Sequence, residues 1–334
     1  MSYEQQREFI FQKVRTMVPG TFDALALDVF RFQAAHNAVY ARYLSLLKVD
    51  FQKVDSIGSI PFLPIQFFKN HVVKTGTWIP ETTFSSSGTT GDATSRLPVR
   101  DVDFYLENAM SGFRHFYGDP AEYCILALLP SYLERLGSSL VCMAEHFIRQ
   151  SNYPQSGFFL KNTDELLQII AAGRPPKVLL LGVSFALLDL AERHAPGLHD
   201  VVVMETGGMK GRRRELTRPE LHGILKKAFK VSVIHSEYGM TELFSQAYSK
   251  GEGRFFPAPS MRVFSREITD PLTRQQPGKT GVLDIIDLAN FDTCSFIATG
   301  DLGRVFPDGS FEVLGRLDNS DIRGCNLMMS SLRQ

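Results

Sequence analysis

The sequence predicts an α/β fold in which parallel strands are flanked by helices and are followed along the chain by a smaller, mostly β segment. Short, continuously apolar runs alternate with helical patterns between residues 120 and 240. Strands that are apolar on both faces are typical of parallel sheets covered by helices. The last third of the chain carries closely spaced short strand patterns and a PDG turn at 307–309, which favour an added β-rich segment.

The N-terminal part predicts helices, then an extended entry into the main body. In residues 1–50 apolar positions recur every three or four residues with few breakers, the spacing of amphipathic helices. In the following run IGSIPFLPIQFFKNHVV, Pro61 and Pro64 exclude a regular helix. The run RDVDFYLENAMSGFRHFYG at 100–118 again has helical spacing.

Alternating strand and helix patterns between residues 123 and 239 predict the parallel sheet. Strands are predicted at YCILALLP (123–130), PKVLLLGVSF (176–185), HDVVVMETGG (199–208) and VSVIHSEYG (231–239). Helices are predicted at LGSSLVCMAEHFIRQ (136–150), ALLDLAERH (186–194) and RPELHGILKKAF (218–229). Further strands are expected in GVLDIIDL (281–288) and in the segment 295–318.

The composition narrows the classes of function. The 334-residue chain has an apolar fraction of 44%, and its 36 Lys and Arg balance 36 Asp and Glu. This balance gives no reason to expect binding to nucleic acid or to an anionic membrane. We expect no secretory signal, because charges interrupt the N-terminus, and no membrane span, because no apolar window approaches about 20 residues.

The cysteines favour a reducing cytoplasm. The chain has 4 cysteines, without CxxC spacing, so neither a metal site nor a disulfide framework is expected. They are Cys124, Cys142, Cys294 and Cys325.

The segment FSSSGTTGDATSR at 84–96 allows two interpretations. Gly88 and Gly91 flank two threonines, and such glycines permit a backbone that points successive N–H groups into one concavity. Together with the hydroxyls this would form an anion cradle. The alternative is an ordinary linker or surface turn. A P-loop is excluded, because the GxxxxGK pattern is absent.

Four short motifs resemble those of the adenylate-forming superfamily, which includes acyl-CoA synthetases and luciferases. SSSGTTG (85–91) resembles its phosphate loop, and HSEYGMTEL (235–243) resembles its Tyr-Gly-x-Thr-Glu motif. TGDLGR (299–304) and GRLD (315–318) resemble its Thr-Gly-Asp motif and its hinge motif, in the family's order. The resemblance implies the large N-terminal domain of that fold, with parallel-rich sheets, a small β-rich subdomain and a mostly absent small C-terminal domain.

Three further segments are similar to the LuxE-type acyl-protein synthetases, with phenylacetate-CoA ligases the next most similar group. They are IPFLPIQFFK (60–69), ETGGMKGRRREL (205–216) and DIRGCNLMMSS (321–331). From the motifs we expect a helical segment (1–55), an α/β adenylate-binding core (56–250), a β-rich subdomain (251–314), and a hinge with a truncated C-terminal segment (315–334).

The resemblance implies ATP and Mg²⁺ as cofactors and assigns the phosphate loop. The hydroxyl and glycine positions of the loop would hold the β- and γ-phosphates. They are Ser86, Ser87, Gly88, Thr89, Thr90 and Gly91. Where the family closes this loop with Pro-Lys, this chain has DATSR, and Arg96 is the nearby cation.

The other motifs imply the rest of a nucleotide site. Thr241 would donate to the α-phosphate and Glu242 would bind Mg²⁺, a hard ion that prefers carboxylate oxygen. Asp301 would accept from the ribose hydroxyls, Arg316 would contact the ribose or phosphate, and Asp318 matches the hinge residue. Tyr238 would line the adenine or acyl pocket, and Gly239 beside it would belong to the ATP site. Gly207 and Gly208 would form a backbone ledge against the adenine.

Each of these residues also has an ordinary structural interpretation. Glu242 could be a solvated carboxylate at a helix start, and Asp301 a turn former. Gly207 and Gly208 could form a plain turn, and Arg316 a surface pair. We interpret His71 and His235 as structural residues rather than general bases, because a carboxylate substrate is already ionised at neutral pH.

Cys325 is the candidate acyl acceptor, because it occupies the place of the acylated cysteine in the LuxE-type proteins. In an extended segment Arg323 would share its face and lower the thiol pKa. The alternative is a small buried apolar residue. The family's catalytic lysine, from its C-terminal domain, has no counterpart before Gln334. Activation then proceeds without it, a partner chain supplies it, or the sequence is shortened.

The expected function is ATP-dependent activation of a carboxylic acid, fatty by resemblance, to its acyl-adenylate with release of pyrophosphate. The acyl group would then pass to a thiol, that of Cys325. Two alternatives remain: an acid–CoA ligase of the phenylacetate-CoA ligase type, and a non-catalytic adenylate-binding subunit of a larger complex. Acyl-reductase or acyl-transferase proteins are the partners that the resemblance implies.

Overall fold

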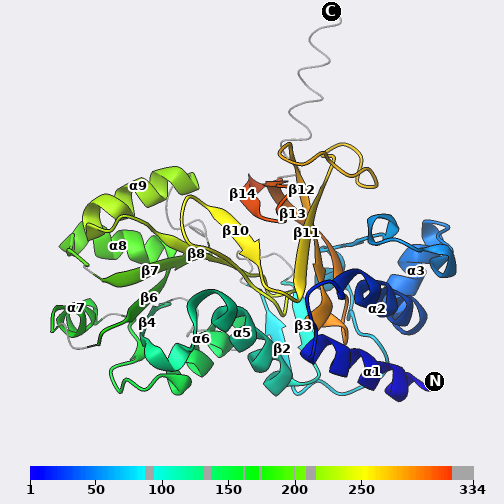
Figure 1. The fold of residues 1–334 in the computed structure, drawn as a ribbon, viewed down its shortest axis with the longest axis horizontal. Helices are drawn as coiled ribbons and strands as arrows, with labels where there is room; N and C mark the ends of the chain where they lie inside the picture. The colour runs from blue at the N-terminus through cyan, green and yellow to red at the C-terminus, as the bar shows by residue number, and fades with distance from the viewer. Residues whose placement is uncertain are drawn as a thin grey trace, which may run out of the picture.

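The computed structural model describes residues 1–86, 94–130, 137–160, 162–172, 175–198, 200–207 and 216–317. A long mixed sheet runs through the molecule in the order β11-β12-β13-β14-β10-β9-β8-β7-β6-β4-β5, and β1 pairs with β13 beside this path. Helices cover the sheet at one end and flank its β-rich part at the other (Figure 1).

Residues 1–50 are helical, as predicted, and form α1 (Tyr3–Arg15), α2 (Phe22–His36) and α3 (Ala38–Leu46). The 3-10 turns η1 (Phe51–Lys53) and η2 (Ile57–Ser59) follow. The run predicted as extended contains the short β1 (Leu63–Pro64) but also the one-turn helix α4 (Phe67–Asn70), which begins after Pro64. A small hairpin follows, in which β2 (Thr82–Ser85) pairs antiparallel with β3 (Arg96–Val99). This hairpin was not predicted. It frames the Ser/Thr/Gly-rich segment.

The parallel part of the sheet matches the predicted alternation. Its strands are β4 (Cys124–Leu128), β5 (Gly157–Phe158), β6 (Val178–Val183), β7 (Val201–Thr206) and β8 (His235–Tyr238), and all pairings among them are parallel. Helices α8 (Ser184–His194) and α9 (Arg218–Phe229) lie on one face, and α5 (Val102–Tyr117) and α6 (Ser139–Gln150) on the other (Figure 1). The remaining elements here are η3 (Pro120–Glu122) and α7 (Thr163–Ala171).

The β-rich part is antiparallel and includes the predicted PDG turn. Its strands are β9 (Ala247–Ser249), β10 (Arg254–Pro257), β11 (Met261–Arg266), β12 (Thr280–Asp287), β13 (Phe296–Val305) and β14 (Phe311–Arg316), with η4 (Leu288–Asn290) between β12 and β13. The residues of β10 are shared: Arg254 and Phe255 pair with β14, whereas Phe256 and Pro257 pair with β9. One strand therefore joins the two parts of the sheet.

Local sequence explains where the central helices begin and end. Asp101 caps α5 by accepting from the backbone N of Phe104 at 2.8 Å, and the helix ends at Gly118, whose φ of 82° suits glycine. Thr217 and Glu220 form a reciprocal capping box at the start of α9. These caps satisfy backbone groups that a helix cannot pair internally.

The N-terminal helices are fastened to the segment after β12. Arg7 forms a two-point ion pair with Asp292, through Nε–Oδ1 at 2.8 Å and Nη2–Oδ2 at 2.7 Å. The buried amide of Gln33 donates to the carbonyl of Phe291 at 2.9 Å and accepts from the backbone N of Ser295 at 2.9 Å. The predicted 1–55 segment thus packs on the β-rich part through specific polar contacts.

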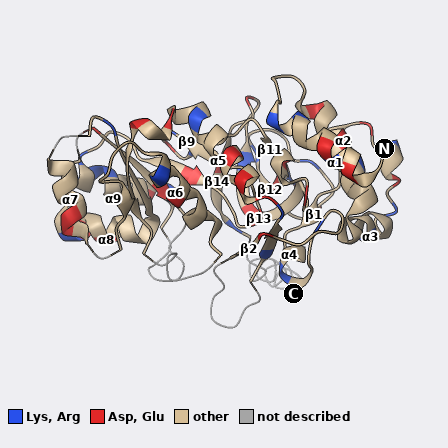
Figure 2. Cartoon of the chain, turned by 90° about the horizontal axis from the view of Figure 1, so that it is seen from below, with Lys and Arg blue, Asp and Glu red and all other residues tan. Residues whose placement is uncertain are grey.

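The charged side chains are mixed rather than segregated by sign. Lys and Arg lie close to Asp and Glu along the molecule (Figure 2), in keeping with the formal net charge of +0. In the described residues, every helix is too short or too polar to pass through a bilayer.

Candidate functional site

Tyr238 and Asp301 connect the two parts of the sheet. Tyr238 ends β8, and its hydroxyl donates to Asp301 Oδ2 at 2.7 Å. Both residues are buried, at 8% and 7% exposure. Burial raises the pKa of the Tyr238 phenol well above its usual 10, and the charge of Asp301 adds to the effect, so the tyrosine remains a hydrogen-bond donor.

Asp301 and Arg316 are brought together by strand register. In the antiparallel β13–β14 pair, Asp301 lies directly opposite Arg316, so both side chains share one face. Arg316 Nε donates to Asp301 Oδ1 at 3.3 Å, and the Asp301 carboxylate raises the pKa of the guanidinium. The backbone N of Asp301 donates to Thr299 Oγ1 at 3.0 Å within β13, so the alternative of Asp301 as a turn former is wrong.

Glu242 is a buried carboxylate in a turn. It follows β8 outside any helix and is 5% exposed, so the alternative of a solvated helix-start residue is wrong. Burial raises the pKa of its carboxyl group, whereas a hydrogen bond from Ser95 and the charge of Arg316 act in the opposite direction. Asn290 Nδ2 donates to the carbonyl of Glu242 at 2.8 Å and holds the turn.

Ser86 and Ser95 close the base of the Ser/Thr/Gly-rich segment. The backbone N of Ser86 donates to the carbonyl of Ser95 at 3.0 Å, and the backbone N of Ser95 donates to Ser86 Oγ at 2.9 Å. Because Ser95 also contacts Glu242, two predicted motifs meet here. Arg96 is exposed on β3, opposite Ser85. The loop positions Ser87, Gly88, Thr89, Thr90 and Gly91 lie outside the described residues.

The remaining predicted positions are more open. Gly207 is exposed just after β7 with φ of 66°, and its carbonyl accepts from Ser184 Oγ at 3.2 Å. Gly239 is exposed and Thr241 half-buried in the turn after β8. Gly208, Asp318, Arg323 and Cys325 fall outside the described residues.

The two histidines take no part in this cluster. His235 Nδ1 lies 3.1 Å from the hydroxyl of Tyr117, and burial, aided by the charge of Lys250, lowers the pKa of its imidazole to about 4. His71 is exposed and lies against the ring of Phe67.

Sequence reasoning missed a buried ionic cluster around Glu205 on β7. Glu205 Oε1 lies 3.0 Å from Arg218 Nε and 3.5 Å from His222 Nε2, and Oε2 accepts from Ser184 Oγ at 3.2 Å. Burial alone would raise the pKa of Glu205, but His222 and Arg218 together hold it below its ordinary value. Arg218 also donates through Nη1 to the carbonyl of Val313 at 3.0 Å, which links β7 to β14.

Glu237 is a second buried carboxylate that was missed. Its side chain accepts from Thr206 Oγ1, and burial, with the charge of Glu205 adding, raises the pKa of its carboxyl group to about 7. The available signal was a carboxylate near the end of each of two apolar strand runs, MET and HSEY. Such a residue in a buried strand needs a partner or a function.

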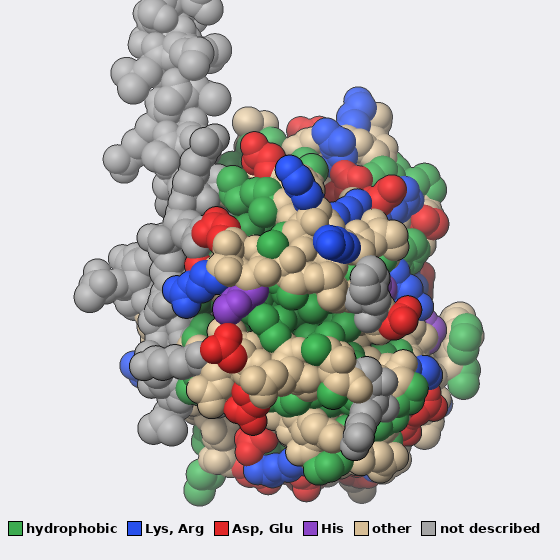
Figure 3. Space-filling model, turned by 90° about the vertical axis from the view of Figure 1, so that its left-hand side faces the viewer, with side chains coloured by type: hydrophobic (Ala, Val, Ile, Leu, Met, Phe, Trp, Pro, Cys, Tyr) green, Lys and Arg blue, Asp and Glu red, His purple; other side chains and the backbone are tan. Residues whose placement is uncertain are grey.

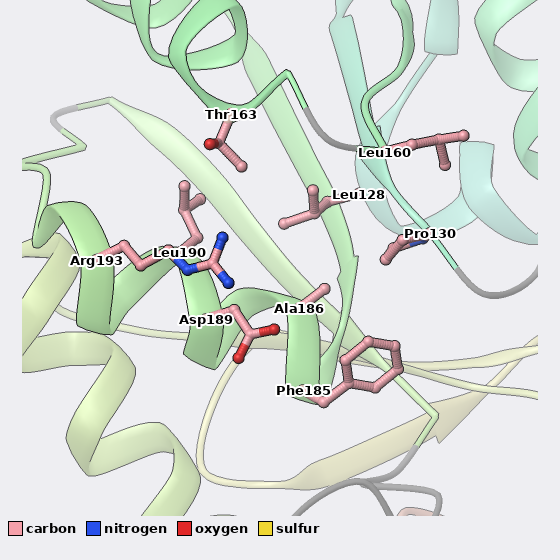
Figure 4. Close-up of a pocket in the computed structure, with 9 residues that line it drawn as sticks. All are labelled: Leu128, Pro130, Leu160, Thr163, Phe185, Ala186, Asp189, Leu190 and Arg193. Carbon is pink, nitrogen blue, oxygen red and sulfur yellow. The ribbon is translucent and has the colours of Figure 1, made fainter.

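A cavity of about 410 Å³ opens beside α8. Figure 4 shows apolar side chains from the β4 end and α8 around it, with Asp189 and Arg193 on one wall. Seen from the α7 end of the molecule, apolar side chains reach the surface in a central band among charged ones (Figure 3). None of the predicted site residues that the structure describes lines this cavity.

The described residues offer isolated carboxylates rather than a preformed group of metal ligands. In the part of the chain that the structure describes, no three His, Cys, Asp or Glu side chains are grouped to hold an ion. Glu242, with Asp301 near enough to influence its pKa, offers oxygen ligands of the kind Mg²⁺ prefers.

Comparison with solved structures identifies the fold. ATP-bound MatB from Rhodopseudomonas palustris matches with a TM-score of 0.52 and 16% identity, over 70% of this chain and 47% of MatB. A 2-hydroxyisobutyryl-CoA ligase in complex with 2-HIB-AMP and CoA matches with a TM-score of 0.65 and 14% identity, over 92% of this chain and 71% of the ligase. No family model and no curated protein sequence matches the chain.

The chain therefore has the α/β fold of the large domain of adenylate-forming ligases, which confirms the predicted fold class. It spans about half the length of MatB.

Proposed function

We propose that this chain activates a carboxylic acid with ATP. A carboxylate oxygen of the acid attacks the α-phosphorus, the bond from that phosphorus to the bridging oxygen breaks, and pyrophosphate leaves with the electron pair. The products are an acyl-adenylate and pyrophosphate. Fatty acids, the predicted substrates, are among the acids to be tested below.

The observation that carries this proposal is the meeting of four separate motifs at one place. Tyr238, Asp301 and Arg316 are joined by hydrogen bonds, and Glu242 contacts Ser95 at the base of the loop. In our assignment Asp301 accepts from the ribose hydroxyls, and Arg316 and Thr241 donate to the ribose and α-phosphate. Fixed donors of this kind stabilise the charge that develops on phosphate oxygens.

The remaining loop and ledge positions complete the assignment. Ser86 and the loop residues up to Gly91 would donate to the β- and γ-phosphates. Gly207 and Gly208 would offer backbone against the adenine, beside Tyr238 and Gly239. The exposed, positive-φ backbone of Gly207 is suited to close approach by a flat ring.

The Glu242 carboxylate is a suitable ligand for Mg²⁺. Glu242 supplies a carboxylate whose pKa is raised by burial, and a bound cation would stabilise its charged form. Mg²⁺ in such sites is held by one or two carboxylates together with substrate phosphates. When bound, Mg²⁺ would neutralise part of the negative charge on the phosphates.

We propose Cys325 as the acyl acceptor. Its thiolate would attack the carbonyl carbon of the acyl-adenylate, forming a thioester and releasing AMP, with acyl-reductase or acyl-transferase proteins as partners that receive the acyl group. CoA is the alternative thiol, favoured by the CoA bound in the similar 2-hydroxyisobutyryl-CoA ligase structure. The organisation into 1–55, 56–250, 251–314 and 315–334 is part of this proposal.

Pyrophosphate exchange tests the activation step. Radiolabelled pyrophosphate should enter ATP only when a suitable acid is present, over a panel of fatty, aromatic and substituted acids. Glu242→Gln and Asp301→Asn should lower exchange strongly, whereas Glu252→Gln, at an exposed turn residue, should not. Silence with every acid, from protein shown to be folded, would favour a non-catalytic adenylate-binding subunit.

Radiolabelled acid tests the acceptor. With ATP present, label should precipitate with the protein without CoA and be lost in Cys325→Ala but not in Cys142→Ala. Label found only on a soluble CoA thioester would overturn the assignment to Cys325 and support the CoA ligase.

A further inference from the structure

Three polar side chains are buried together where β8 pairs with β9. Glu237 lies opposite Tyr248 in the antiparallel register, and Gln246 is two residues before Tyr248, so all three side chains lie on one face of the sheet. Their exposures are 6% for Glu237, 1% for Tyr248 and 4% for Gln246. The rings of Phe113 and Phe116 on α5 pack against Tyr248, which identifies this face as the one toward α5.

Two polar atoms of the cluster are left without a hydrogen bond. Gln246 Oε1 and the Tyr248 hydroxyl are buried and have no partner among the residues that the structure describes. The orientation of the Gln246 amide is fixed, because its Nε2 donates to the carbonyl of Phe244 at 3.2 Å and Oε1 must then face away. In the described part of the chain, Thr206 Oγ1 is the only hydrogen-bond donor to the Glu237 carboxylate.

A negative charge on Glu237 would also be uncompensated. Glu205 is the charged group that acts on Glu237, and it is negative. Among the described residues, the phenols of Tyr105 and Tyr248 also interact with Glu237, and they remain neutral because burial raises their pKa values well above 10. Buried polar groups are normally satisfied, so acceptors left open here point to a ligand that donates.

The cluster adjoins the proposed site of acid activation. A Cβ at Gly239 would lie 2.5 Å from Glu237 Oε1 and 3.6 Å from Gln246 Cγ, so glycine leaves the space that these two side chains occupy. Gly239 stands between Tyr238, which contacts Asp301, and the turn that carries Thr241 and Glu242. The open acceptors therefore lie beside the turn that leads to the proposed nucleotide-binding residues.

We propose that Glu237, Gln246 and Tyr248 bind the part of the acid distant from its carboxylate, and that they select an acid bearing a hydrogen-bond donor, either a hydroxyl or an ammonium group. This inference rests on the proposed acid activation. A plain hydrocarbon chain would leave the Glu237 carboxylate and the Gln246 carbonyl desolvated and unpaired, which is unfavourable. Sites that hydrogen-bond a substrate group discriminate strongly against analogues that lack it.

Pyrophosphate exchange over matched acids tests the selection. Each chain length is assayed as the unsubstituted, hydroxy-substituted and amino-substituted acid. Wild type should show a kcat/KM at least ~10-fold higher for a donor-bearing acid than for its unsubstituted analogue. Glu237→Leu and Gln246→Leu should abolish or reverse this preference, whereas Glu8→Gln, at an exposed α1 residue, should leave it unchanged.

The conservative variant separates the two donors. Glu237→Gln keeps an acceptor oxygen but removes the charge, so a hydroxy acid should retain most of its kcat/KM and an amino acid substrate should lose ~10-fold or more. Preference of wild type for unsubstituted acids, unaltered by Glu237→Leu, would overturn the inference and leave acid activation standing.

A binding measurement covers the case in which exchange is silent with every acid. The unfolding temperature of wild type and Glu237→Leu is then measured with each acid added. A rise with donor-bearing acids that is absent in the variant supports the selectivity even where the proposed activation fails. If no donor-bearing acid stabilises wild type, the inference is wrong.

Discussion

The hydroxyl of Tyr238, at the end of a parallel strand, donates to Asp301 Oδ2 in the antiparallel part of the sheet at 2.7 Å. Asp301 also accepts from Arg316 on the neighbouring strand at 3.3 Å. One carboxylate thus orients a neutral donor and a cation from two different sequence motifs, so its removal should disturb both.

Asp301→Asn should weaken nucleotide binding with little loss of fold. The variant keeps the volume and one acceptor for Tyr238 but loses the charge that holds Arg316, so the KM for ATP in pyrophosphate exchange should rise ~10-fold or more. Asp28→Asn, in an exposed pair on α2, is the control. An unchanged KM for ATP would show that Asp301 does not contact the nucleotide.

Arg7→Met should destabilise the protein by about 2–3 kcal/mol, because it leaves Asp292 buried without its main counter-charge. The side chains of Arg7 and Asp292 are 12% and 9% exposed. Arg15→Met breaks an exposed pair with Glu107 and should cost less than about 1 kcal/mol. Urea unfolding measures the free energy of unfolding of both variants. Equal losses would show that the buried Arg7–Asp292 pair contributes no more to stability than the exposed Arg15–Glu107 pair.

Glu237→Gln should remove a pH dependence of stability. The folded-state pKa of Glu237 is raised from 4.5 to about 7, so the folded protein holds a proton that the unfolded chain releases. Stability from this group is complete below pH 4.5 and falls as the pH rises to 7, by about 3 kcal/mol in all. His235 gives the opposite slope, gaining stability between pH 4 and 6.5, but it is present in both proteins.

The measurement is the difference in free energy of unfolding between wild type and Glu237→Gln across pH 4.5–7. Relative to wild type, the variant should become more stable as the pH rises through this window. A difference that does not vary with pH would mean that Glu237 ionises normally in the fold.

Gly239→Ala should destabilise the protein through steric conflict with Glu237. The added methyl would lie 2.5 Å from Glu237 Oε1, so the carboxylate or the turn must move. Combining it with Glu237→Ala removes the conflict, so the double variant should lose less stability than the sum of the two single losses. Additive losses in thermal unfolding would contradict this arrangement.

The parallel core was accessible from the sequence because its strands are apolar on both faces. The runs around Ile125, Leu180 and Val203 need no long-range information to be recognised, and the structure confirms them as β4, β6 and β7. The hairpin of β2 and β3 was missed, since TTFS and RLPV are short and Pro98 weakens the strand pattern.

The sequence motifs identified the candidate site residues, but they did not predict which of these residues contact one another. The proximity of Asp301 and Arg316 depends on the register of β13 and β14, and that of Tyr238 on the packing of the two parts of the sheet. The carboxylates of Glu205 and Glu237 lie inside strand patterns where only the tertiary structure reveals that they are buried.

The division of β10 between two partners has a consequence for how the protein unfolds. Because Arg254 and Phe255 pair with β14 while Phe256 and Pro257 pair with β9, neither part of the sheet can melt without exposing the edge of the other. We therefore expect a single cooperative transition, and amides of Tyr248 and Glu312 that exchange with solvent at similar free energies.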